Sequence, residues 1–556
     1  MRKQPNLILI MTDDQGYADL GCTGNPWIRT PHLDAFSRRC TRLGDFHVSP
    51  LCTPTRGAIM SGHNPLRNGA WATTWGRSML RRDETTMADV FAHNGYRTGM
   101  FGKWHLGDNY PYRPQDRGFQ TVVAHRGGGV GQTPDFWGNS YFDDTYFHNG
   151  RPVPHDGYCT DIWFDEAMGF IEQNRDEPFF CYLATNAPHA PYRVEDRYTD
   201  LYRDIEQIPE PAFYGMITNI DENMGRLLEH LDELDLSRDT ILIFMTDNGS
   251  SGGWEPHTGR GYNAGMRGKK GSYYEGGHRV PFFIRWPAGD ITPDRDLPHL
   301  TTHTDLLPTF IDLCGLDAPD DLDFDGISLA PLLRGEEQAL PDRDIFVQYR
   351  QSMHPPEKWE NAVLSGRWRL VRGNELYDVH ADPGQQDDVC GDHPDILERL
   401  RTAHERWWEE ISPRLQEICP IVLGSPHENP TRLCAFDVLG DVAWDQSHIR
   451  QARACSGRWH VEIARPGRYR FSLRRWPREL GLPIDAALAD DPATSIHPAR
   501  ARLQIAGTEH SVEVQPDAVS ADFSLQLEPT TTDLEAAFLD TNDEPQGAYY
   551  VHVERQ

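Results

Sequence analysis

Continuously apolar runs alternate with segments of helical periodicity in the N-terminal half of the chain. The runs cover residues 6–12, 97–102, 178–189 and 240–246. A helix is expected over residues 86–96, with Gly95 as its stop. A second helical stripe, with steps of three and four residues, consists of Ile217, Ile220, Met224, Leu227, Leu228 and Leu231. Apolar strands that alternate with such helices predict an α/β fold, a mostly parallel sheet sandwiched by helices.

Each of the four apolar runs leads into side chains that can carry chemistry. In chain order these are Asp13, Asp14, Lys103, His105, His189, Asp247 and Asn248. Ligands of parallel α/β sheets bind beyond the carboxyl ends of the strands. The pattern therefore predicts one site at that edge of the sheet.

Four of these side chains offer hard oxygen ligands, namely Asp13, Asp14, Asp247 and Asn248. Such a set suits Ca²⁺, with Mg²⁺ as the second choice, whereas zinc prefers nitrogen and sulfur. Any single Asp fits a turn or a helix cap equally well. Three carboxylates close together would repel one another, and a cation relieves that repulsion.

Basic side chains complement the carboxylates. Lys103, His105, His189 and Lys270 would together bind a tetrahedral oxyanion and supply an acid for a leaving group. A lone His is more often structural than catalytic, and a lone Lys is usually solvated surface. As a set at strand ends they indicate an anion site.

Cys52 opens the segment CTPTR, four residues before Arg56. Thr53 and Pro54 fit an N-cap and a first helical residue, and the helix dipole would favour negative charge near Cys52. One interpretation is a buried thiol beside a helix start, and the other is a nucleophile. Soft sulfur is a poor ligand for a hard cation, so an oxygen nucleophile would suit this metal better than a thiolate.

Composition restricts the partners of the chain. Its 556 residues predict two to four domains at about 150 residues each. A formal charge of -30 argues against nucleic acid and anionic membranes as partners. Ten cysteines without a C-x-x-C pair favour reduced thiols. The apolar run after Arg2 and Lys3 is too short for a signal peptide, so a cytoplasmic protein is expected, or a periplasmic or secreted one if a leader was trimmed.

The segment Cys52-Thr53-Pro54-Thr55-Arg56 matches the C-x-P-x-R signature of the type I sulfatases, in the alkaline phosphatase superfamily. Further family motifs stand in the family's order over roughly residues 5–385, namely TDDQG, TPHLDAF, GKWHLG, TDNG, KGSYYEGG and ELYDVHADP. The chain thus resembles a formylglycine-dependent sulfatase. The resemblance implies that a formylglycine-generating enzyme oxidises Cys52 to formylglycine, whose hydrate is the oxygen nucleophile.

The resemblance also implies roles for the other site residues. Arg56 would hold the hydrated aldehyde, and His105 would take its second proton. Lys103, His189 and Lys270 would bind the sulfate, with the last two protonating the leaving oxygen. The Ca²⁺ ligands would be Asp13, Asp14, Asp247, Asn248 and the modified Cys52.

Two rival functions remain open at this point. One is a phosphonate or phosphodiester hydrolase of the same superfamily, although such relatives tend to have His in place of Asn248. The other is an inactive sulfatase that binds glycans, against which the intact Cys52, Arg56 and metal positions argue. The expected substrate is a small sulfated sugar, attacked at a chain end or as a short oligosaccharide.

Three domains are expected. Residues 1–340 form the α/β domain, residues 341–415 a small antiparallel sheet with a helix over 394–411, and residues 430–556 an all-β, sandwich-like domain. Residues 411–430 are expected to be a linker. The C-terminal domain would bind glycans, close the site, or form the interface of a homo-oligomer.

Contacts to the sugar are expected from a long aromatic- and glycine-rich loop over residues 104–150, which would wall the substrate pocket. His125 and Arg126 from this loop, together with Trp75 and His354, are the candidate sugar contacts.

Overall fold

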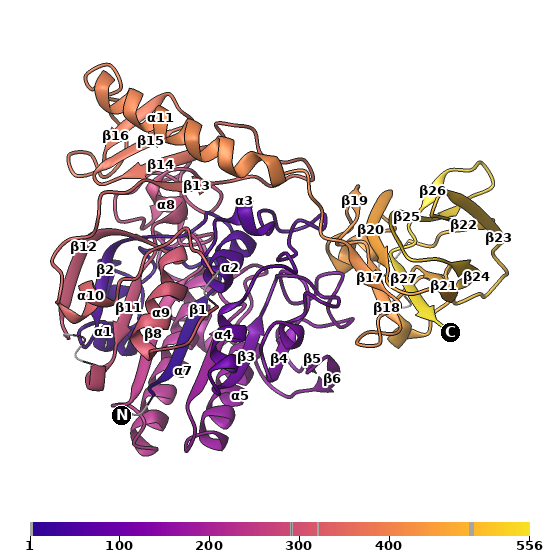
Figure 1. The fold of residues 1–556 in the computed structure, drawn as a ribbon. Coiled ribbons are helices and arrows are strands. Elements are labelled where there is room, and N and C mark those ends of the chain that lie inside the picture. The colour runs from indigo at the N-terminus through magenta and orange to yellow at the C-terminus, as the bar shows by residue number, and fades with distance from the viewer. Residues whose placement is uncertain (1–3, 290, 292, 320–321, 489–493) are drawn as a thin grey trace.

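The described strands form one large sheet, a two-stranded ribbon of β9 (Trp254–Glu255) and β10 (Arg260–Gly261), one small antiparallel sheet and a C-terminal pair of sheets (Figure 1). The computed structural model describes residues 4–289, 291, 293–319, 322–488 and 494–556. The large sheet is mostly parallel and has helices on both faces, so the predicted α/β class is confirmed.

The large sheet has ten strands. Their order is β12 (Arg295–Thr302), β2 (Thr41–His47), β11 (Phe282–Arg285), β8 (Thr240–Thr246), β1 (Asn6–Thr12), β7 (Phe179–Ala184), β3 (Arg97–Lys103), β4 (Thr121–His125), β5 (Thr145–His148) and β6 (Arg151–Pro154). The five neighbours from β8 to β4 are all parallel. Their carboxyl ends therefore meet at one edge.

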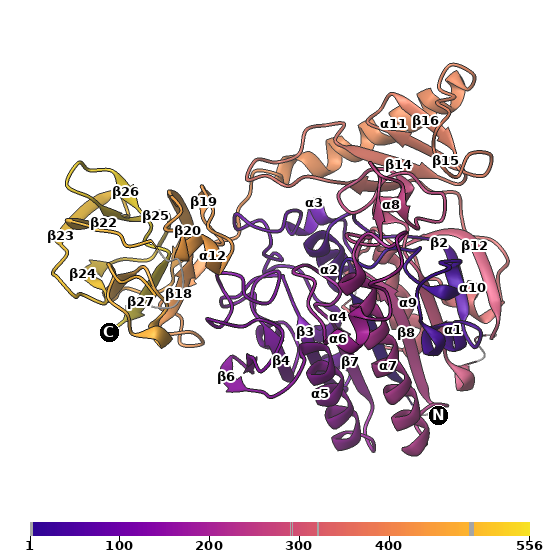
Figure 2. The ribbon, with the colours of Figure 1, turned by 180° about the vertical axis from the view of Figure 1, so that it is seen from behind.

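Alternate side chains of the central strand β1 enter two separate cores. Leu7, Leu9 and Met11 pack on one face, and Ile8 and Ile10 on the other. The first face is covered by α2 (Cys52–Ser61), α4 (Met87–His93) and α9 (Leu306–Cys314), and the second by α1 (Pro31–Ser37), α5 (Cys159–Gln173) and α7 (Pro211–Glu233). Figure 2 shows α5 and α7 side by side. No described helix is long and apolar enough to cross a membrane.

The small antiparallel sheet lies against the large one. It consists of β13 (Ile345–Gln348), β14 (Asn361–Ser365), β15 (Trp368–Val371) and β16 (Glu375–Asp378). Helix α11 (Pro394–Ile411) covers it through Leu400, which packs on Val363, Leu370 and Leu376. The helix over 394–411 and an antiparallel sheet within residues 341–415 are where the sequence predicts them.

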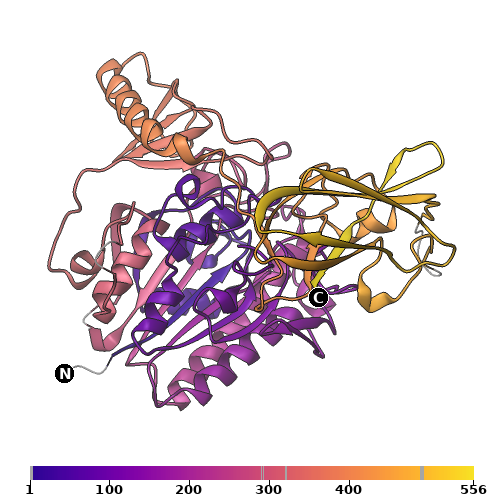
Figure 3. The same cartoon turned by 45° about the vertical axis from the view of Figure 1, so that its right-hand side comes forward.

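The C-terminal sheets pack face to face around one apolar core. One contains β17 (Ile421–Leu423), β20 (Gly457–Ile463), β25 (Thr530–Leu539), β22 (Arg500–Ile505) and β23 (Thr508–Glu513), with β19 (Leu439–Gly440) and β26 (Pro545–Gln546) alongside. The other contains β18 (Thr431–Cys434), β27 (Tyr550–Arg555), β21 (Gly467–Arg474) and β24 (Ala521–Leu527). The sandwich borders the carboxyl-end side of the large sheet (Figure 3).

Two sequence-based expectations about loops are wrong. Residues 411–430 do not form a plain linker, because β17 within them pairs in parallel with β20. Residues 104–150 are not one loop, because β4 and β5 lie inside that segment and extend the large sheet. Each of these strands is only three to five residues long, and pairing with a neighbouring strand holds it in its sheet.

Candidate active site

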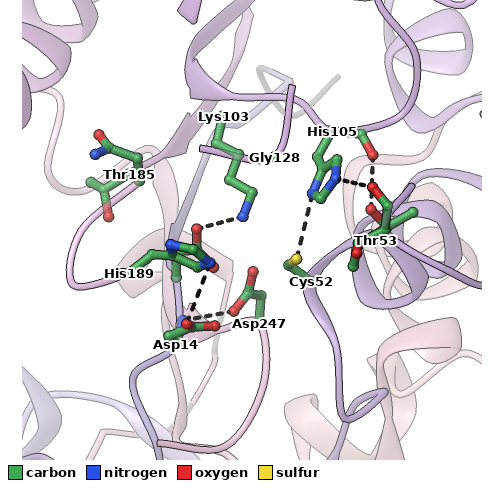
Figure 4. A network of polar contacts seen from close by, with 12 residues as sticks. Asp14, Cys52, Thr53, Lys103, His105, Gly128, Thr185, His189 and Asp247 are labelled. Carbon is green, nitrogen blue, oxygen red and sulfur yellow. Dashed lines mark hydrogen bonds and ion pairs between the residues drawn. The ribbon is translucent and has the colours of Figure 1, made fainter. Parts of the chain in front are cut away.

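The sheet brings the predicted strand-end residues to one place. Strands β8, β1, β7 and β3 are consecutive neighbours, so the residues that follow them lie side by side. The pairing continues past the strands, because Asp247 N–H donates to Thr12 O at 3.0 Å and Asp13 N–H to Ala187 O at 3.1 Å. Figure 4 shows this cluster from close by.

Helix α2 delivers Cys52 to the cluster from a different direction. The helix begins at Cys52, after an extended Leu51, and all ten of its residues are buried. The expectation that Thr53 caps the helix is therefore wrong. The hydroxyl of Thr53 instead donates to the carbonyl of His105 at 3.2 Å, and the Thr55 hydroxyl accepts from Ser49 N–H at 3.0 Å, which orders the turn before the helix.

The three aspartates are buried and each has a cationic partner. The guanidinium of Arg56 donates to one oxygen of Asp247 at 2.8 and 3.2 Å. Lys103 Nζ lies 2.5 Å from Asp13 Oδ2, and Lys270 Nζ lies 2.5 Å from Asp14 Oδ1. The site is thus a compact set of alternating charges inside a strongly acidic protein.

The donor set fits a hard divalent cation. Oδ1 of Asp13 and Oδ1 of Asn248 are buried and have no hydrogen-bond partner. Ligand atoms of Asp13, Cys52 and Asp247 lie within 4.8 Å of one another. Burial, and then the negative charge of Asp13, raise the pKa of Asp247 to about 7, against the effect of Arg56. A bound cation would satisfy the unpaired oxygens and favour the ionised carboxylate.

Asn248 and Lys270 are positioned by close backbone contacts between the two segments that carry them. A Cβ on Gly249 would lie 2.0 Å from Gly276 O, so any side chain there would collide with backbone. Lys270 N–H donates to Ser250 O at 3.2 Å. The DNG and KGSYYEGG motifs are thus two halves of one packed unit, which holds the amide of Asn248 and the ammonium of Lys270 near Asp14.

His189 and Lys270 lie where the cluster meets solvent, since each side chain is 20% exposed. His189 Nδ1 donates to Ala190 O at 2.5 Å, which directs Nε2 toward Asp14, 3.7 Å away. Burial is the main reason that the pKa of His189 is lowered to about 4, with Lys270 and Lys103 acting in the same direction and Asp14 against them. Asp14 holds the pKa of Lys270 above its ordinary range despite burial, so this ammonium remains charged.

His105 faces Cys52. Its Nε2 lies 2.9 Å from Thr73 O, and because a carbonyl only accepts, the neutral ring carries its proton on Nε2. Nδ1 is then a free base, 3.4 Å from Cys52 Sγ (Figure 4). Burial, reinforced by Lys103, lowers the pKa of His105 well below its ordinary value, and burial likewise raises the pKa of the Cys52 thiol. The unmodified residue is therefore a neutral thiol.

The candidate sugar contacts lie in several surroundings. His125 is buried at the end of β4, beside Lys103 in the register. Arg126 stacks over Phe147 and lines a small cavity with Trp104 and Asp108. Trp75 Nε1 donates to Gly440 O of the sandwich at 3.2 Å. His354 is exposed. Contact of these four with a sugar stays a prediction.

Two contributors to the site were missed from sequence. Thr73 fixes the tautomer of His105 through its carbonyl, which any residue type supplies, so no sequence signal marks it. Phe436 of the sandwich has its ring centroid 6.1 Å from that of His105. It lies far from the motifs in sequence, and only the tertiary fold brings it near.

Comparison with known proteins places this site in a family. The family model described as Sulfatase matches residues 5–316, and that described as N-sulphoglucosamine sulphohydrolase, C-terminal, matches residues 268–409. The chain is 31% identical to human arylsulfatase A, over 81% of this chain and 86% of that protein. It is 30% identical to human N-acetylgalactosamine-6-sulfatase, over 68% of this chain and 75% of that protein.

Among solved structures, Ps i-CgsB in complex with k-i-k-neocarrahexaose is 28% identical with a TM-score of 0.66, covering 73% of this chain and 93% of that one. The two matched family ranges end at residue 409, and the C-terminal sandwich lies beyond them.

Proposed function

The chain belongs to the sulfatase family and is a sulfuric ester hydrolase, and on that premise we propose that it removes sulfate from a carbohydrate by means of a modified Cys52 and a bound Ca²⁺. The observation that carries the proposal is the position of Cys52. It lies between a base, His105, and a hard-ligand set that contains two unpaired buried oxygens.

Ca²⁺ would be held by Asp13, Asp14, Asp247, Asn248 and the modified residue 52, all of which the fold brings together. The ion would supply electrostatic stabilisation of negative charge on oxygen. Sulfur at position 52 suits neither this ion nor nucleophilic attack at neutral pH, because the thiol pKa is raised. Conversion of Cys52 to formylglycine by a formylglycine-generating enzyme would supply a hydrated aldehyde, an oxygen nucleophile.

The surrounding residues would perform the remaining tasks. Lys103, His189 and Lys270 present nitrogen atoms from three segments and would bind the sulfate oxygens. His189 and Lys270, at the solvent side, would protonate the leaving oxygen, and sulfate binding would favour the protonated form of His189. His105, with Nδ1 free, would accept a proton at residue 52, and Arg56 would hold that residue in place while it neutralises Asp247.

The names of similar proteins support a carbohydrate substrate. N-acetylgalactosamine-6-sulfatase and the neocarrahexaose complex of Ps i-CgsB are both similar to this chain at 28% identity or more. The charge of -30 restricts the substrate further, because a long polyanion across the surface would be repelled, with screening beyond about 8 Å in physiological buffer. A chain end or a short oligosaccharide meets mainly the local basic groups.

Sulfate release from a panel of sulfated mono-, oligo- and polysaccharides, with an aryl sulfate as reference, tests the proposal. We expect activity on the aryl sulfate and higher kcat/KM on at least one sulfated mono- or oligosaccharide. Activity confined to the aryl sulfate would contradict the carbohydrate substrate and leave the sulfatase assignment intact. Rapid release from internal positions of a polymer, with none from oligosaccharides, would contradict the preference for short substrates.

A further inference from the structure

The C-terminal sandwich shares its apolar core with the catalytic part of the chain. Met79 and Tyr112 belong to the same buried cluster as the sandwich residues Leu433, Phe436 and Trp459. Polar contacts also cross this boundary, since Tyr112 Oη donates to Pro420 O at 2.8 Å. The sandwich is therefore packed onto the catalytic part rather than tethered to it.

One turn of the sandwich reaches the active site. It connects β18 to β19 and contains Phe436, which is 2% exposed. The turn is fixed within the sandwich, because Cys434 O accepts from Trp459 Nε1 at 2.8 Å and Ala435 N–H donates to Tyr549 O at 2.8 Å. It is tied to the catalytic part by the N–H of Trp75, which donates to Phe436 O at 3.3 Å. Phe436 thus sits at a rigid point.

His105 is held by several segments at once. Its backbone has a φ of 58°, a strained value for a residue with a side chain. A Cβ on Gly128 would lie 2.3 Å from His105 Cε1, so the backbone of Gly128 abuts the ring. Nε2 is bonded to Thr73 O, and the Phe436 ring lies tilted by 52° at 6.1 Å. In this arrangement Nδ1 of the ring faces Cys52 Sγ at 3.4 Å.

We infer that the sandwich contributes to catalysis through Phe436. Phe436 is a positioning residue that holds the His105 ring with Nδ1 directed at residue 52. The inference rests on the role proposed for His105 as the base. It assigns a task to a region beyond the matched family ranges. A smaller side chain at position 436 would leave space beside the ring, so that Nδ1 would point at residue 52 for a smaller fraction of the time.

Graded truncation of Phe436 in the full chain tests this inference. A misplacement of about 1 Å costs as much as 100-fold in rate, so Phe436→Ala should lower kcat by roughly tenfold to 100-fold, with KM within about twofold of the parent. Phe436→Leu, which keeps part of the apolar contact, should lower kcat about threefold. Each rate is divided by the fraction of Cys52 converted to formylglycine, measured by mass spectrometry in the same preparation.

Phe523 provides a matched control. It is a buried phenylalanine of the same core, on β24 at the edge of the sheet opposite β18. Phe523→Ala and Phe523→Leu should lower thermal stability as much as the Phe436 variants while leaving kcat unchanged. If Phe436→Ala does not fold, the two leucine variants decide the question. Equal kcat for the Phe436 and Phe523 variants would overturn the inference.

His105→Gln separates this inference from the proposed role of His105. We expect it to lose most of its kcat, because a general base contributes about 10²–10⁴-fold. Full activity of His105→Gln would refute the role of the base itself. An inactive His105→Gln beside a fully active Phe436→Ala would refute the positioning role alone.

Discussion

Arg369 joins the small antiparallel sheet to the large sheet through a buried ion-pair network, and its replacement by leucine should destabilise the protein. Its Nε donates to Glu275 Oε1 at 2.7 Å, and its Nη2 donates to the two Asp45 oxygens at 3.0 and 3.2 Å. The side chains of Arg369 and Glu275 are each 1% exposed. Arg369→Leu would therefore leave the charge of Glu275 buried, with Arg279 Nη1, 3.8 Å from Oε2, as its remaining ion-pair partner.

The magnitude follows from that burial. Removal of one partner of a buried ion pair costs about 3–5 kcal/mol. We expect the lower half of that range for the free energy of unfolding at pH 7, because Asp45 keeps a contact with His47 at 2.8 Å. Glu275 is the first residue of α8 (Glu275–His278), directly after the loop that carries Lys270, so a loss of sulfatase activity should accompany the loss of stability.

The difference in unfolding free energy between parent and Arg369→Leu should depend on pH. Burial alone would raise the pKa of Glu275, but Arg369, helped by His47, lowers it to about 2. Arg369 likewise holds the pKa of Asp45 below its ordinary range against burial. A carboxyl with a depressed folded pKa stabilises the fold above its unfolded pKa, about 4.3 for Glu, and this stability is lost as the pH falls toward the folded value. The difference between parent and Arg369→Leu should thus be largest near pH 7 and shrink in acid.

Urea unfolding of parent and variant at pH 7 and at pH 4 measures this difference. Arg367→Leu is the control, because Arg367 pairs with Asp378 in the same sheet but is 45% exposed, and exposed pairs contribute little. Its unfolding midpoint should match that of the parent. An Arg369→Leu midpoint equal to the parent's at pH 7, or a difference that does not change with pH, would refute the reasoning.

Two further predictions concern the active site. Asp13→Asn should lower both the bound Ca²⁺, measured by elemental analysis, and most of the activity, because the hard ion loses a charged ligand; full activity after exhaustive chelation would contradict the metal assignment. Sulfate release from an aryl sulfate should far exceed phosphate release from the matching phosphate ester and diester, and a preference for the diester would favour the phosphodiesterase alternative.

The central sheet could be predicted because its strands are long enough for their apolar pattern to indicate burial on both faces. In β1, residues on alternate sides are all apolar, as expected for a strand covered on both faces. The residues that end these strands were found for the same reason, since the parallel order fixes where Asp13, Lys103 and Asp247 meet.

Elements whose stability comes from their neighbours were not predicted. Strand β25 is central in its sheet, yet its sequence TTTDLEAAFL mixes exposed threonines with helix-favouring Leu, Glu and Ala, and pairing with β20 and β22 decides its conformation. Helix α2 begins at Cys52 rather than at the expected Pro54, and the Thr53 hydroxyl bonds to His105 O instead of capping its own helix. Phe436 was missed for a similar reason, because only tertiary packing brings its ring near that of His105.

The state of residue 52 tests the central claim most directly. Mass spectrometry of the peptide around Cys52, from protein produced with a formylglycine-generating enzyme, should show the thiol replaced by an aldehyde or its hydrate. Across preparations with different conversion, the rate of sulfate release per mole of protein should rise in proportion to the converted fraction and extrapolate to zero without conversion. A fully active preparation in which residue 52 is entirely unmodified cysteine would contradict the account.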